Sequence, residues 1–210
     1  MPNRRIKIQR DVVLPRIERK REGWICVIAI EGERTEKQYF QKFGSTKIKI
    51  EILPTLSGDS AEPEGVIERL RKYKSENDLG EEDKCWLVVD VDHRSEDRLK
   101  AVCVQAREER FQVAISNPCF EFWLFLHRFE ATELQQGIYQ AMPEQRPHEM
   151  KRMLDYDYKS LPYKEFRSDV EKAIQRAKSK EHSRRSAVPG FPGTDVYRVA
   201  ESLPIKAIEG

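Results

Sequence analysis

The chain has 210 residues, of which 39% are apolar and 35% charged, and its mean hydropathy is -0.72. This length fits one domain of ordinary size with a small appendage, and it is long enough to bury a real core. The longest apolar run, residues 119–126, contains Glu121 and is far too short to span a bilayer. No apolar stretch follows the basic N-terminus, so we expect neither a signal peptide nor a membrane anchor.

The cysteines are widely spaced and lie mostly inside apolar segments. This placement is typical of small buried side chains in a reducing compartment, and no zinc-binding spacing is present. We therefore expect a cytoplasmic protein. The four positions are Cys26, Cys85, Cys103 and Cys119.

Positive charge is distributed unevenly, although the net charge is only +2. Residues 1–22 hold eight Lys or Arg against three acids and few large apolar groups, which indicates a flexible basic arm. Residues 178–194 are rich in Lys, Arg, Ser, Pro and Gly and predict a mobile basic loop. A solvated tail without a partner is an equally open interpretation of the arm. If these segments bind nucleic acid, the candidate residues are Arg4, Arg5, Arg19, Lys20, Arg21, Lys178, Lys180, Arg184 and Arg185.

The first half of the chain alternates between strand and helix patterns. Continuous apolar runs predict strands buried on both faces, the strict alternation of KIKIEIL at 47–53 predicts a strand with one more exposed face, and apolar positions three or four residues apart predict amphipathic helices between them. This order predicts an α/β fold with a mostly parallel sheet. The expected strands are 24–30, 47–53 at the sheet edge, 85–89 and 111–115, and the expected helices are 35–43, 62–73 and 96–110.

The last third has a different character. An apolar helix is expected to open at Pro118, because a proline is tolerated in the first turn, and two more helices are expected at 163–177 and 195–203. The predicted organisation is therefore a basic arm at 1–22, an α/β core at 23–116 and a helical C-terminal part at 117–210, packed as a cap on the core.

Acidic residues follow two of the predicted buried strands. Glu31 comes directly after the first strand, and Asp90 and Asp92 follow the third. Because functional groups collect beyond the carboxyl ends of parallel strands, we expect these carboxylates to converge at one edge of the sheet. Oxygen ligands suit Mg²⁺ or Mn²⁺, and such a metal would polarise a phosphate, with Glu31 available as a general base.

Other roles are open for each of these residues. Asp and Glu are common helix caps, and both acidic motifs precede a predicted helix. His93 is interpreted as an exposed loop residue, with a ligand or proton-shuttle role as the alternative. Glu121, inside an apolar helix, requires a salt bridge, a hydrogen bond or a metal.

Several segments together resemble the RloB family, a group of Toprim-like proteins linked to phage defence and restriction-modification loci. The segments are IEGERTEKQYF at 30–40, VVDVDHR at 88–94, AISNPCFEFWLFLH at 114–127, YDYKS near 156 and TDVYRVAESL at 194–203. The resemblance implies a Toprim-like sheet in which Glu31, Asp90 and Asp92 bind metal. Many Toprim motifs carry a third aspartate where this chain has Arg94, which leaves the number of metals open. The family-like segments add Glu36, Asn117, Glu121 and Lys159 as secondary site candidates, with no chemistry assigned.

The function that the resemblance implies is a metal-dependent nuclease acting on DNA or RNA in an abortive-infection or restriction-linked defence system. A partner protein from a defence operon and a homo-oligomer are both compatible with the sequence. The alternative is a non-catalytic nucleic-acid-binding or sensor subunit on the same scaffold. A stand-alone structural protein is the third and least favoured hypothesis.

Overall fold

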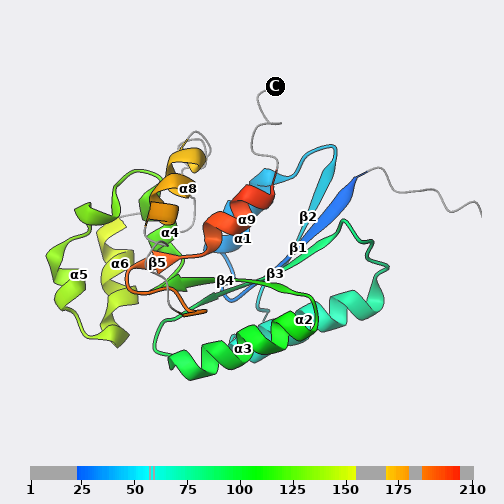
Figure 1. The fold of residues 1–210 in the computed structure, drawn as a ribbon, viewed down its shortest axis with the longest axis horizontal. Coiled ribbons are helices and arrows are strands. Elements are labelled where there is room, and N and C mark those ends of the chain that lie inside the picture. Colours follow the sequence, from blue (N-terminus) through cyan, green and yellow to red (C-terminus); the bar gives the residue numbers. More distant parts are fainter. Residues whose placement is uncertain (1–22, 57, 59, 155–168, 180–185, 204–210) are drawn as a thin grey trace, which may run out of the picture.

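The computed structural model of the chain describes residues 23–56, 58, 60–154, 169–179 and 186–203. The predicted basic arm, Lys159 and residues 180–185 of the predicted basic loop lie outside these residues. Figure 1 shows the arrangement of the described elements around a central sheet.

The sheet has five strands in the order β2-β1-β3-β4-β5. Strands β1 to β4 are parallel to their neighbours, and only β5 runs antiparallel, against β4. The strands are β1 (Trp24–Ile30), β2 (Ile48–Leu53), β3 (Lys84–Asp90), β4 (Gln112–Asn117) and β5 (Gly193–Thr194). This confirms the predicted α/β fold with a mostly parallel sheet, the edge position of β2, and a Toprim-like architecture.

Helices connect the strands and form most of the C-terminal third. The α-helices are α1 (Thr35–Phe40), α2 (Pro63–Glu76), α3 (Glu96–Glu108), α4 (Glu121–Leu126), α5 (Gln136–Gln140), α6 (Arg146–Leu154), α8 (Val170–Ser179) and α9 (Val196–Ser202). Three single-turn 3₁₀ helices are η1 (Gln41–Phe43), η2 (Ala131–Glu133) and η3 (Pro143–Gln145).

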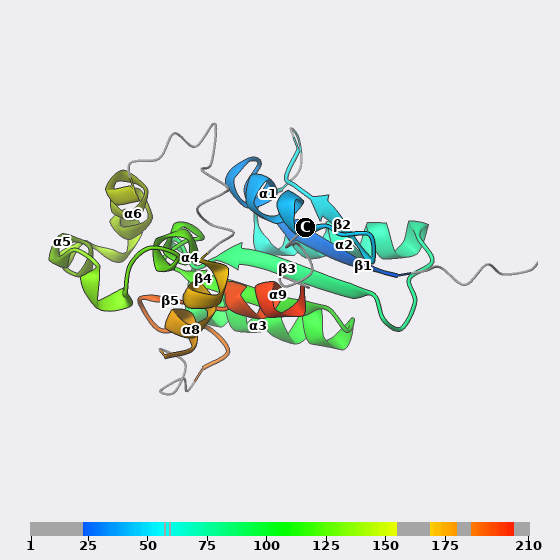
Figure 2. The same ribbon diagram turned by 90° about the horizontal axis from the view of Figure 1, so that it is seen from above.

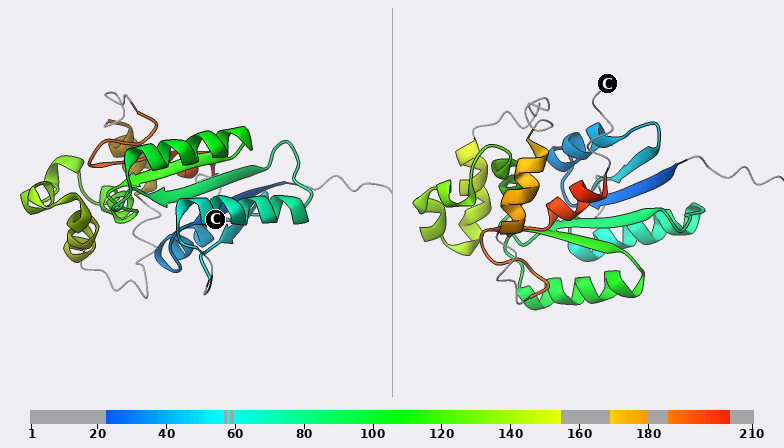
Figure 3. Two further views of the ribbon diagram at one scale, coloured as in Figure 1. Left: turned by 90° about the horizontal axis from the view of Figure 1, so that it is seen from below. Right: turned by 45° about the horizontal axis from the view of Figure 1, so that its top comes forward.

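The two faces of the sheet are covered by different helices. Side chains alternate along each central strand, so that Ile28 of β1 packs with α1 and α9, while Val27 packs with α2 and α3. Both sets are fully buried, which explains why the strands read as continuous apolar runs. Figure 1 and the right panel of Figure 3 show α2 and α3 on one side of the sheet and α1 and α9 on the other.

The helices α4, α5 and α6 lie beyond the carboxyl ends of the parallel strands. In Figure 2 the arrow of β3 points towards α4, with α5 and α6 farther out. Buried side chains of α4, including Phe122 and Trp123, belong to the same apolar cluster as β1 and α1. The C-terminal third therefore closes one end of the sheet and also covers part of one face through α9.

The start of α4 differs from the prediction. The helix begins at Glu121, not at Pro118, because β4 extends to Asn117 and the next residues are held in other contacts. The Asn117–Pro118 peptide is cis, and the Pro118 carbonyl accepts a hydrogen bond of 2.9 Å from the backbone N–H of Asp92.

The segment predicted as a loop at 178–194 also differs. Its last two residues form β5, in which Thr194 pairs with Ser116, and its first two still belong to α8. A two-residue strand is too short to leave a periodic signal in the sequence. The predicted helix at 163–177 corresponds to α8, of which residues 170–179 are described.

Among the described residues, no helix combines the length and the apolar character that crossing a bilayer requires.

The central strand β3 gives a test of the core. Leu87 is 0% exposed and packs against α2 and α3, so Leu87→Ala leaves a cavity and is expected to lower the free energy of unfolding by about 3 kcal/mol. Urea denaturation monitored by circular dichroism measures this. The control is Val104→Ala, at a side chain that is 53% exposed, for which we expect a change within about 0.5 kcal/mol. Equal effects of the two substitutions would contradict the predicted packing.

Candidate functional site

The candidate site lies at the carboxyl ends of β1 and β3, the two strands between which the chain reverses its direction of winding. From β1 the chain crosses through α1 on one face of the sheet, and from β3 it crosses through α3 on the other. In open α/β sheets, ligands bind in the crevice at this switch point. Glu31 directly follows β1 and Asp90 is the last residue of β3.

The predicted convergence of these two acids is observed. The Glu31 carboxylate accepts a hydrogen bond of 2.8 Å from the backbone N–H of Asp90, because β1 and β3 are adjacent and in parallel register. Two side chains also donate hydrogen bonds to the backbone at the end of β1. Thr55 donates a hydrogen bond of 2.7 Å to the Glu31 carbonyl, and Arg69 donates one of 2.8 Å to the Ile30 carbonyl.

Glu36 reaches the same place from the first turn of α1. Its carboxylate folds back to accept a hydrogen bond of 3.2 Å from the backbone N–H of Gly32, and its side chain is buried. A Cβ atom at position 32 would overlap this carboxylate. A side chain at position 32 would therefore displace the Glu36 carboxylate from this contact, although the backbone conformation of Gly32 does not itself call for glycine.

Glu121 enters from α4 and completes a cluster of carboxylates, which we call the acidic cluster: Glu31, Glu36, Asp90 and Glu121. Burial raises the pKa of Asp90 well above its ordinary value, and the charges of the other three members raise it further. Burial likewise raises the pKa of Glu36 to about 7, with Glu121 and Glu31 adding to the effect. The neighbouring carboxylates therefore oppose ionisation of Asp90 and Glu36.

Two cations border the acidic cluster. Arg94 forms an ion pair with Glu31 and donates a hydrogen bond of 3.2 Å to the Asp90 carbonyl. It also contacts Glu62 at 3.3 Å, and its own side chain is almost fully buried. Lys151 of α6 lies 3.9 Å from a Glu121 oxygen. Burial opposes the charged form of Lys151, but the carboxylates, Glu121 foremost, raise its pKa above the ordinary value.

Glu31 shows how these effects compete at one carboxylate. Burial raises its pKa, while the hydrogen bond from the Asp90 backbone and the Arg94 guanidinium act in the opposite direction, and the net shift is upward. Four carboxylates facing two cations leave two negative charges without a described counter-ion when all are ionised.

Asp92 and His93 stand at the margin of the acidic cluster. Asp92 has a left-handed backbone with φ of 45°, and its half-exposed carboxylate lies 3.1 Å from His93 Nδ1. Its charge adds to the upward shift of the Glu31 pKa, whereas the largest effects on the pKa of Asp90 come from burial and from Glu31, Glu36 and Glu121. His93 is exposed, as expected for a loop residue. Of the three acids predicted as metal ligands, Glu31 and Asp90 therefore lie in the cluster and Asp92 lies beside it.

The remaining candidates have other contacts. Asn117, at the end of β4, donates a hydrogen bond of 2.9 Å to the Pro189 carbonyl. Lys178 forms an ion pair with Glu201 and lies over the ring of Tyr197. Lys159, Lys180, Arg184, Arg185 and the five candidates in residues 1–22 lie outside the described residues.

Arg94, Lys151, Glu62, Thr55 and Arg69 were not predicted as site residues. Arg94 could have been found from the sequence, because it occupies the position at which many Toprim motifs carry a third aspartate. Lys151 left none, because it comes from a helix some 60 residues beyond β3 in the chain and meets the cluster only through packing of α6 on α4.

The donor set of the acidic cluster fits a hard divalent cation in type and in charge. Carboxylate oxygens are the ligands that Mg²⁺ and Mn²⁺ prefer, and the raised pKa values of Asp90 and Glu36 mark a site that a cation would relieve. Within the described part of the chain, no three His, Cys, Asp or Glu side chains already form a metal-ligating group. Binding would therefore require these carboxylates to reorient.

The model of the family described as "RloB-like protein" matches residues 26–203, which runs from the third residue of β1 to the end of α9 and includes the four residues of the acidic cluster. Neither the curated proteins nor the solved structures gave a match. Since the match spans most of the 210 residues, the chain belongs to the RloB-like protein family.

Proposed function

We propose that this chain is a metal-dependent nuclease that hydrolyses phosphodiester bonds of DNA or RNA in an anti-phage defence system. The observation that carries the proposal is the acidic cluster, an excess of buried carboxylates at the switch point of an open α/β sheet. The defence setting rests on the RloB-like family alone.

The proposed ligands of the metal are Asp90, Glu36 and Glu121, with Asp92 at the exposed margin. A bound Mg²⁺ or Mn²⁺ ion would polarise the scissile phosphate and lower the pKa of an attacking water. Asp92 and His93 are accessible from solvent beside the cluster, so a phosphate of a polymeric substrate would approach from their side.

The chain's own groups have separate roles in this proposal. Glu31 has a raised pKa and is held at both ends of its carboxylate, by Arg94 and by the Asp90 backbone, so it is positioned to accept a proton from water. Arg94 and Lys151 carry positive charge at the border of the cluster, where a phosphate would approach.

A second candidate function is a non-catalytic nucleic-acid-binding or sensor subunit. The contact that favours it is the buried ion pair between Arg94 and Glu31, which already compensates one of the predicted metal ligands. Under this alternative, Arg94 and Lys151 offset two of the four carboxylates, and bound protons neutralise the others without a metal. The two functions make opposite predictions for metal binding.

Removing the central carboxylate tests the metal site. We expect the native chain to bind Mn²⁺ in calorimetric titration at pH 7.5, and Asp90→Asn to weaken binding at least tenfold, because a charged ligand is replaced by a neutral one. The matched control is Asp97→Asn, the same change at a side chain that is 97% exposed on α3, which should bind as the native chain does. Equal absence of binding in all three proteins would favour the sensor function.

Cleavage assays test the chemistry. We expect labelled single- and double-stranded DNA and RNA to show metal-dependent cleavage of at least one substrate, abolished by EDTA and lowered at least a hundredfold by Glu31→Gln, which cannot accept the proton. Asp97→Asn again serves as the control. Cleavage that persists in both Glu31→Gln and Asp90→Asn would contradict the assignment of the acidic cluster as the catalytic site.

Protons and metal ions are competing ways to neutralise the acidic cluster, which predicts a pH dependence. The pKa of Glu36 is raised from 4.5 to about 7, so between these values the folded chain binds more protons than the unfolded chain. Stability from this group is complete below pH 4.5 and is lost as the pH rises through 7. We expect the Tm of the metal-free protein to fall from pH 6 to pH 8 by roughly 3 °C or more.

Two comparisons isolate the contribution of Glu36 to this fall. Saturating Mn²⁺ should reduce it, and Glu36→Gln, which is neutral at both pH values, should reduce it without metal. Differential scanning calorimetry measures the three cases. A variant with the same pH dependence as the native chain would show that Glu36 is not the titrating group.

A further inference from the structure

The edge of the sheet opposite β2 is only partly closed. Strand β5 pairs with β4 at Ser116 and Asn117 alone, and the backbone N–H of Asp195 adds one hydrogen bond of 2.8 Å to the Ile115 carbonyl. Residues of β4 before Ile115 have no partner strand on this side within the described chain. In the described part of the chain, the first half of β4 therefore presents a strand edge that no other strand pairs with.

The direction of the free backbone groups follows from the ladder. Ile115 points its carbonyl towards β5, and Ser116 points its carbonyl towards β3, where it accepts from Val91. Because successive residues alternate, Val113 directs its N–H and C=O to the same side as Ile115, which is the free edge. The Val113 N–H and C=O can therefore pair with an added strand that lies along the first half of β4, on the same side of β4 as β5.

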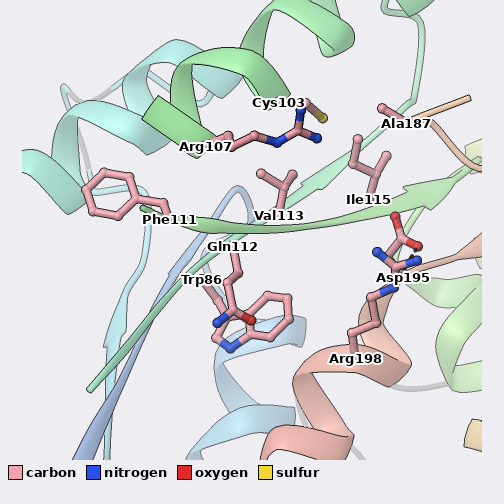
Figure 4. Close-up of a pocket in the computed structure, with 10 residues that line it drawn as sticks. All are labelled: Trp86, Cys103, Arg107, Phe111, Gln112, Val113, Ile115, Ala187, Asp195 and Arg198. Carbon is pink, nitrogen blue, oxygen red and sulfur yellow. Dashed lines mark ion pairs between the residues drawn. The ribbon is translucent and has the colours of Figure 1, made fainter. Parts of the chain in front are cut away.

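A pocket of about 410 Å³ runs along this edge, between α3 and α9. That volume lies in the range of ligand sites. Figure 4 shows that the pocket wraps around β4: Arg107 and Val113 lie on the α3 side of the strand, whereas Trp86, Gln112 and Arg198 lie on the α9 side. Side chains of an added strand alternate between the two faces, and here each face offers its own set of contacts.

Charge and hydrogen bonding indicate what the pocket accepts. Arg107 is exposed and forms no ion pair with any described residue. Arg198 lies 3.7 Å from the buried Asp195, so the charge of that acid is already balanced and the pocket keeps a net positive charge. The indole N–H of Trp86, which is 3% exposed, has no acceptor among the described residues, so a polar acceptor beside Gln112 would be favourable there.

We propose that the β4 edge binds an extended acidic peptide of a partner protein, which adds to the sheet as a strand next to Val113 and places a carboxylate against Arg107. The occupant is a partner and not a second copy of this chain, because pairing two β4 edges about a two-fold axis would bring the two positive pockets together. The proposal is independent of the acidic cluster, which lies at the ends of β1 and β3.

The probe is a fluorescein-labelled peptide of eight residues with alternating Val and Glu, and its counterpart with Lys in place of Glu. Fluorescence polarisation with the full chain should show binding of the acidic peptide only. Val113→Pro removes the outward N–H without removing a hydrogen bond to β3, and it should weaken binding about fivefold. Arg107→Glu should weaken it by a similar factor or more.

Control variants separate the proposed contacts from general charge and stability. Lys72→Glu reverses the same charge on exposed α2, away from the edge, and should leave binding unchanged. Circular dichroism checks that Val113→Pro is folded. If Val113→Pro does not fold, Arg107→Glu still tests the site, because Arg107 is exposed and its substitution does not disturb the core. Equal binding of both peptides, or no binding of either at millimolar concentration, would overturn the proposal. A native dimer in sedimentation that Val113→Pro dissociates would assign the edge to a second copy instead.

Discussion

The adjacency of β1 and β3 is the constraint on which the candidate site depends. Because these strands are parallel neighbours, Glu31 meets the backbone of Asp90, and the chain leaves the two strands on opposite faces of the sheet. The crevice between these departures admits Glu36 from α1 and Glu121 from α4. The apolar packing that buries β1 and β3 also removes water from the four carboxylates. The packing that stabilises the core therefore also raises the free energy of the charged carboxylates.

Arg94 is the residue that offsets part of this negative charge, because it forms an ion pair with Glu31. In a buried setting, an ion pair recovers its desolvation cost only when further hydrogen bonds satisfy both partners, and Arg94 has these through Glu62 and the Asp90 carbonyl. One carboxylate is thereby neutralised, while Asp90 and Glu36 keep raised pKa values. Arg94 thus gives a site otherwise dominated by acids a fixed counter-charge.

The sequence predicted the sheet well because β1, β3 and β4 contain apolar runs, β2 alternates between apolar and charged residues, and amphipathic helices lie between them. It predicted the meeting of Glu31 and Asp90 because both follow strand ends. It did not predict β5, which is too short for a pattern, nor the start of α4, where the contacts of Pro118 with Asp92 override a local preference for helix. Lys151 was also unpredictable, because its place beside Glu121 depends on how α6 packs on α4 and not on any spacing in the chain.

The contact between Gly32 and Glu36 has a consequence for how variation in this family should be interpreted. Any side chain at position 32 must displace the Glu36 carboxylate, although the backbone there is open to every residue type. In a saturation mutagenesis experiment, substitutions at position 32 would consequently lower activity as substitutions of the charged site residues do, although Gly32 contributes no functional group of its own. A shorter residue at position 36 would remove the overlap, so the effect of a substitution at position 32 would depend on which residue stands at 36.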